Sequence, residues 1–197
     1  MMKTSSAFVF ASLLTAYCSL SQAEVTGTCV EVVEASLKEG NPRATLEKYF
    51  SCEKYEGSAY EGIASGSTKW ISLAERMLQY SDACYTEGIQ ASLGKAMQRS
   101  PKNVLSLVDK TSTLAASYIC LPFISSELPI KLQLTEVIRS RKAIQNVHDD
   151  RLQTQKAACI HFIKSVEVNL IAQQSSTSQE SNVPSKGTPP DKPLGVH

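Results

Sequence analysis

Aromatic residues are scarce in this 197-residue chain: they make up 7% of it, and tryptophan occurs once. A glycosidase needs two carboxyl groups that face each other across a cleft, and aromatic rings usually line such a sugar groove. The carboxylate pairs Glu31 with Glu34 and Glu47 with Glu53 are instead typical of the polar face of an amphipathic helix. The sequence therefore argues against sugar hydrolysis.

Catalytic and metal-binding signatures are also missing. The chain has no Gly-x-Ser-x-Gly elbow, no His-Glu-x-x-His, no phosphate loop and no dinucleotide fingerprint. The two glycines of residues 62–66 lack the lysine of a phosphate loop and indicate a turn. His148, His161 and His197 share no helical spacing that would let them hold one metal ion. We therefore predict no catalytic residue, no metal and no cofactor, and a non-enzymatic role is favoured.

Charge of one sign is not in excess either, since 20 basic residues stand against 19 acidic ones. Counterion release from nucleic acid needs clustered cations, and a balanced chain does not supply them. The small group of Arg139, Arg141 and Lys142 is interpreted as one solvated helix face. No nucleic-acid partner is predicted.

Long hydrophobic runs are limited to the N-terminus. Residues 1–23 contain one lysine, an apolar run over 7–17, and the small residues Ser21 and Ala23 before Glu24, which together predict a signal peptide cleaved before Glu24. No other stretch approaches the roughly 20 apolar residues that span a bilayer, so no transmembrane segment is expected in the mature chain. No Asn-x-Ser/Thr sequon occurs. A periplasmic or secreted protein of a bacterial envelope is the resulting expectation.

Three helices are predicted between residues 62 and 108. Each begins after a residue that can accept a free N–H group of the first turn, namely Ser67, Ser81 or Asp82, and Ser100 before Pro101. On the second of these helices, Gly88 and Gly94 leave room for a close neighbour. Helices this short, joined by so few residues, are stable only when they bury each other's apolar faces.

The rest of the chain adds further helices and no strand. Apolar spacing predicts helices near 28–38, 42–52, 114–119, 130–147 and 152–172, with a turn-rich connection and one helical turn in 56–66. In the second of these, Asn41 is predicted to be the N-cap and Pro42 the first helical residue. The last two should form an antiparallel pair. The fold class is therefore all-α, either an irregular helical bundle or a short array of helical hairpins. Residues 24–172 form one domain, and the Ser/Pro-rich residues 173–197 are predicted to be a disordered tail.

Five cysteines follow the predicted signal peptide. In the oxidising compartment that an exported protein reaches, such cysteines usually form disulfide bonds. Cys120 ends a short helix beside the terminal hairpin, and Cys159 lies on the inward face of the last helix, which favours a bridge between them. Cys29 and Cys52 flank the first pair of helices and are predicted to bond. Cys84 then remains as a free thiol in the first turn of its helix, either inert or reactive.

One pattern extends over about residues 55–125. It consists of Gly62-Ile63-Ala64-Ser65-Gly66, Trp70-x-x-Leu73-Ala74, Ser81-Asp82-Ala83 and Ser100-Pro101-Lys102-Asn103-Val104-Leu105. In order and spacing it resembles small exported helical proteins of Gram-negative bacteria that have no assigned activity. The resemblance implies export and an all-helical fold, and it carries over no site residue.

These observations leave three hypotheses open. The leading one is a non-enzymatic interaction module of the bacterial envelope, for example an inhibitor or immunity-type partner of another envelope or secreted protein. The second is a structural or tethering envelope protein that uses the tail. The third is a small hydrolase or thiol-active enzyme that uses Cys84. Neither the partner nor the oligomeric state follows from the sequence.

Overall fold

The computed structural model describes residues 28–52 and 58–180, and every regular element in these two ranges is a helix. The all-α prediction is thus confirmed. The predicted signal peptide and residues 181–197 of the predicted tail lie outside the described ranges. The elements are α1 (Val30–Glu39), α2 (Pro42–Tyr49), α3 (Ser58–Ala64), α4 (Thr68–Leu78), α5 (Ala83–Arg99), α6 (Pro101–Leu105), η1 (Ser112–Leu114), α7 (Ala116–Ile119), α8 (Ile130–Gln145), η2 (Asp150–Leu152) and α9 (Gln153–Glu180).

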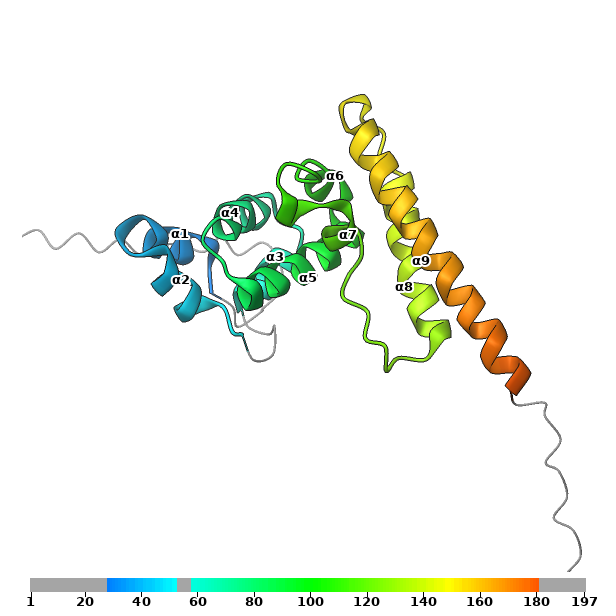
Figure 1. Cartoon of the computed structure of the whole chain (residues 1–197). Helices are drawn as coiled ribbons and strands as arrows, with labels where there is room; N and C mark the ends of the chain where they lie inside the picture. Colours follow the sequence, from blue (N-terminus) through cyan, green and yellow to red (C-terminus); the bar gives the residue numbers. More distant parts are fainter. Residues whose placement is uncertain (1–27, 53–57, 181–197) are drawn as a thin grey trace, which may run out of the picture.

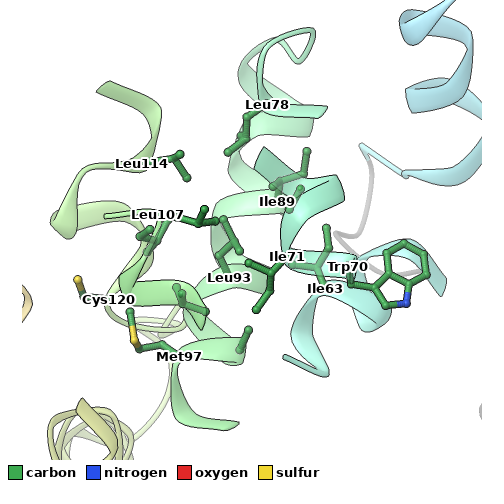
Figure 2. Packing of buried hydrophobic residues seen from close by; sticks show 14 of the residues in the cluster. Ile63, Trp70, Ile71, Leu78, Ile89, Leu93, Met97, Leu107, Leu114 and Cys120 are labelled. Carbon is green, nitrogen blue, oxygen red and sulfur yellow. The ribbon is translucent and has the colours of Figure 1, made fainter. Parts of the chain in front are cut away.

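The helical body, residues 30–119, is organised around α5. This helix packs against α3, α4, α6 and α7, and side chains from these helices meet in one apolar core (Figure 2). Its largest fully buried side chains include Ile63, Leu73, Ile89, Leu93 and Met97. A helix with neighbours on several sides cannot keep a narrow apolar stripe, because most of its faces must be covered.

Glycine allows the close helix contacts in the body. A Cβ atom added to Gly62 on α3 would lie 2.3 Å from the Trp70 indole of α4, and one added to Gly88 on α5 would lie 2.6 Å from the Tyr60 ring of α3. Both distances are far below ordinary van der Waals contact. The prediction that Gly88 admits a close neighbour is therefore confirmed, and α3 is a buried seven-residue helix rather than one turn in a loop.

The helix starts agree with the sequence, but the capping side chains act differently. Asn41 caps α2 as expected, because its Oδ1 accepts from the Arg43 backbone N–H at 2.8 Å. Ser67 precedes α4 and Asp82 precedes α5, yet neither side chain accepts a hydrogen bond from its helix. Asp82 instead forms an ion pair with the Arg43 side chain. That ion pair connects the start of α5 to α2.

The α8–α9 hairpin lies beside the body, at the opposite end from α1 and α2 (Figure 1). Its two helices pack against each other as an antiparallel pair, as predicted, and they contact the body through α5, α6 and α7. The last helix was expected to end near residue 172, but α9 continues to Glu180. Residues 173–180 are polar and still helical, since an exposed helix end needs no apolar stripe once packing has formed the preceding turns. None of the described helices combines the length and apolar character needed to cross a bilayer.

Candidate interaction cleft

An apolar cleft with a volume of about 360 Å³ lies where the body meets the hairpin. Its volume is within the range of natural ligand sites, at the small end. Side chains of α5, α7, the segment after α7, and α9 line it: Glu87, Gln90, Ala91, Ser117, Tyr118, Leu121, Pro122, Phe123, Ile124, Phe162 and Val166. We call it the α5–α9 cleft. Most of these groups are aliphatic or aromatic, so the cleft favours an apolar ligand.

The wall formed by Leu121 and Pro122, which directly follow Cys120, depends on Gly94 of α5. A Cβ atom at Gly94 would lie 1.9 Å from the Leu121 carbonyl oxygen and 2.8 Å from Pro122 Cα. Since backbone atoms cannot swing aside as a side chain can, only glycine allows this approach. The sequence prediction of a close neighbour at Gly94 is confirmed, and the neighbour is the backbone that shapes the cleft. Pro122 ends α7 at Ile119, as its effect on preceding residues predicts.

A disulfide bond between Cys120 and Cys159 joins this wall to α9, with the two Cα atoms 5.4 Å apart. Both cysteines are fully buried. The bond confirms the pairing predicted from the helix pattern. Because it joins the end of α7 to the second turn of α9, it fixes the distance between two sides of the cleft.

Aromatic side chains form the rim of the cleft. Phe123 is 75% exposed and Tyr118 is 53% exposed, whereas Phe162 and Val166 across the cleft are half-buried. Large apolar groups that gather at a concave surface mark interaction sites more often than isolated exposed ones do. Phe123 follows a proline in a segment outside any helix, so its exposed ring does not belong to a helix face.

The polar groups of the cleft are few. Gln90 donates a hydrogen bond from Nε2 to the Thr113 carbonyl oxygen at 2.6 Å, which holds η1 against α5. Ser117 and Glu87 are exposed, and the lining contains neither a histidine nor a lysine that could activate the Ser117 hydroxyl. The cleft thus offers mainly apolar contacts, with few polar groups among them.

The second disulfide corrects two sequence predictions. The structure joins Cys52 to Cys84, with Cα atoms 5.4 Å apart, so the predicted bond between Cys29 and Cys52 is wrong. The reason is the docking of α2 on α5. Arg43 of α2 pairs with Asp82, and its guanidinium lies 5.0 Å from the centre of the Tyr85 ring, which brings the residues after α2 beside the first turn of α5.

Cys84 is therefore not a free thiol, and the prediction of one is wrong. Its sulfur is bonded to Cys52, so it cannot act as a nucleophile in this form of the protein. The proposed thiol chemistry at Cys84 loses its reactive group. Cys29, the other member of the predicted pair, precedes the first residue of α1.

The turn at residues 148–150 is built from ion pairs. Asp149 accepts a hydrogen bond from the Arg151 backbone N–H, pairs with the Arg151 side chain at 2.8 Å, and pairs with Lys102 of α6 at 3.1 Å. These contacts hold the pKa of Asp149 well below its usual range, chiefly through Arg151. In the described ranges, no three side chains of the metal-binding types gather into one site. The turn thus connects the hairpin to the body.

Comparisons with protein-family models, with curated proteins and with solved structures gave no match to this chain. The resemblance to small exported helical proteins stays a prediction.

Sequence reasoning missed the α5–α9 cleft. It placed Cys120, Leu121 and Pro122 at a helix stop but gave no role to the apolar run that follows. The signal present was Leu121-Pro122-Phe123-Ile124, four apolar residues in a segment that proline keeps out of a helix. Such an apolar run is expected either to be buried in the core or to bind a ligand. Only the position of α9 shows which of these four residues remain accessible at the cleft.

Proposed function

We propose that this protein is an exported, non-enzymatic interaction module that binds an extended apolar segment of another envelope or secreted protein in the α5–α9 cleft. The observation that carries the proposal is the exposed Phe123 ring at the rim of an apolar cleft whose walls are held by a disulfide bond and a glycine contact. A preformed site loses little conformational freedom on binding, which favours affinity.

Two features of the described residues support export to an oxidising compartment. The chain forms the Cys52–Cys84 and Cys120–Cys159 bonds, and structural disulfides persist mainly outside the cytosol. Together with the leader-like residues 1–23, this supports localisation in the periplasm or the medium.

The proposal is tested by photo-crosslinking in an exporting bacterial host. A benzophenone amino acid is placed at Phe123, and in a matched control at Tyr80, which is also half-exposed or more but lies at the end of α4, outside the cleft. We expect a stoichiometric protein adduct at position 123 and none at position 80. Equal adducts at both positions would contradict the proposal, and recovery of cell-wall or outer-membrane material would favour the tethering alternative.

Affinity for the isolated partner provides the second measurement. Phe123→Asp places a charge at the apolar rim and removes an aromatic ring that a bound apolar segment would cover, so it should weaken binding about tenfold. Tyr80→Asp should leave the Kd unchanged. A partner that binds both variants equally does not use this cleft.

A further inference from the structure

The described chain ends at the far end of α9, and the residues that follow have the composition of a ligand for the α5–α9 cleft. The sequence of residues 187–194 is Gly-Thr-Pro-Pro-Asp-Lys-Pro-Leu. Proline fixes φ near the value of the extended polyproline II conformation, so such a segment loses little freedom when it binds. Segments of this kind are recognised by grooves lined with aromatic side chains.

The cleft offers such a lining. Three aromatic rings come from three different segments of the chain, namely those of Tyr118, Phe123 and Phe162. Aliphatic surface in the same lining comes from Pro122 and Val166. Proline rings pack well on exposed aromatic faces because both surfaces are flat and apolar.

The geometry of α9 brings the segment within reach. Val166 lies on the cleft, and 14 residues of helix separate it from Glu180, which corresponds to about 21 Å along the helix axis. From Glu180 onward, an extended chain advances about 3.3 Å per residue. Pro189 is therefore within about 30 Å of the end of α9 and can return along the hairpin to the cleft.

We propose that residues 187–194 of this chain occupy the α5–α9 cleft, so that the protein carries an intramolecular ligand that a partner must displace. The inference rests on the proposed function, because it requires that the cleft accept an extended apolar segment. A linker of this length places its ligand at an effective concentration of about 1 mM. A weak intrinsic affinity of the segment for the cleft is then enough to keep the cleft occupied. The tail thereby lowers the apparent affinity of the cleft for a partner.

The test uses amide chemical shifts of the purified, oxidised full chain. A tail variant replaces Pro189, Pro190, Pro193 and Leu194 by serine, and a matched control replaces Val183 and Pro184 by serine, which lie in the same tail outside the segment. We expect the amide signals of Phe123, Phe162 and Val166 to move in the tail variant and to stay in place in the control. Unchanged cleft signals in the tail variant would overturn the inference.

A capped octapeptide of residues 187–194 provides the complementary experiment. Added to the tail variant at about millimolar concentration, it should return the cleft signals to their positions in the unaltered chain. It should have no effect on the tail variant that also carries Phe123→Asp. Shifts in the unaltered chain that depend on protein concentration would overturn the intramolecular assignment, because they would place the tail of a second copy in the cleft.

An unrelated octapeptide of alternating leucine and serine separates this inference from the proposed function. If it binds the cleft of the tail variant while the segment 187–194 does not, the intramolecular ligand is refuted and the interaction site stands. If neither peptide changes the cleft signals at millimolar concentration, the cleft does not accept extended apolar segments, and both proposals are refuted.

Discussion

Helices α5 and α8 have almost the same length, 17 and 16 residues, but they are held in very different ways. Nine residues of α5 are buried, including both glycines, whereas α8 buries three, Val137, Ser140 and Ile144. The α5 helix has neighbours on most of its faces, while α8 has α9 on one side and the body on another. The body is therefore stabilised by a broad core, and the hairpin by a narrow stripe.

Polar contacts and one covalent bond supplement that narrow stripe. Gln98 of α5 donates from Nε2 to Glu136 at 3.0 Å and to Ser140 at 3.1 Å, and Lys102 pairs with Asp149. The Cys120–Cys159 bond then joins α9 to the end of α7. The cleft therefore lies between a body with a broad core and a hairpin that is held by a narrow stripe, polar contacts and one crosslink.

The largest expected effect is the loss of that crosslink. The cysteines are 39 residues apart, and constraining a loop of this length stabilises the folded state by about 4 kcal/mol in the chain-entropy description. The double variant Cys120→Ala with Cys159→Ala should lower the free energy of unfolding by about this amount. Chemical denaturation of the oxidised protein measures it.

The other disulfide provides the matched control, because Cys52 and Cys84 are 32 residues apart and constrain a loop of similar length. Cys52→Ala with Cys84→Ala should cost about as much, roughly 3.7 kcal/mol, yet leave the cleft intact. If ligand binding at the cleft is lost equally in both double variants, the crosslink at Cys120 has no special role there.

The core of the body gives the next effect. Leu93 of α5 is fully buried, and Leu93→Ala should lower the free energy of unfolding by about 3 kcal/mol through lost burial and the cavity left behind. Leu132→Ala on α8 removes the same atoms from a side chain that is 51% exposed. It should change stability by less than about 0.5 kcal/mol. Similar losses at both sites would contradict the difference in burial between these two positions.

A smaller effect is expected where the two parts touch. In Gly94→Ala, the new methyl group meets the Leu121 carbonyl oxygen, and relief of this overlap must move residues 120–122 at a cost of about 1–3 kcal/mol. Gly40→Ala is the control, because its Cβ atom would approach the nearest atom, Ser36 O, at 3.1 Å. We expect altered amide shifts at Phe123 in the first variant alone.

The smallest effect concerns acid stability of the α2–α5 contact. The hydrogen bond from Arg43 lowers the pKa of Asp82 below its ordinary value. A carboxyl whose pKa is lowered by folding stabilises the protein above its unfolded pKa, near pH 4, and loses this contribution as the pH falls through the folded pKa. Asp82→Asn should therefore flatten the fall of stability below about pH 4. Arg43→Gln should reduce this fall in stability by the same amount, and the double variant should reduce it no further. A double-mutant cycle of urea titrations measures these effects.

Local signals in the sequence were enough for much of the body. Asn41 with Pro42 set the start of α2, and the apolar spacing of Trp70 and Leu73 set the buried face of α4. The bond between Cys120 and Cys159 followed from a helix stop before Pro122 and from the inward stripe of the last helix, although the two cysteines are 39 residues apart. The helix starts and the apolar stripes depend on residues close in sequence.

The errors in the disulfide pairing and in the cleft arise from packing between different helices. Cys52 meets Cys84 because Arg43 docks on Asp82 and Tyr85, and no spacing in the sequence reveals that contact. Glycines suggested a loop in 56–66, where Gly62 in fact admits the Trp70 ring. The cleft was hidden for the same reason, since its walls come from α5, α7 and α9.

The central claim is that the cleft forms where a hairpin that depends on a crosslink packs on a self-supporting body. Hydrogen exchange on the oxidised double variant Cys120→Ala with Cys159→Ala tests this claim most directly. The account predicts that amides of α9 and of residues 121–124 exchange much faster than in the unaltered protein, while those of α4 and α5 keep their order of protection. Equal loss of protection in α5 and α9 would contradict it, because the hairpin and the body would then be one cooperative unit.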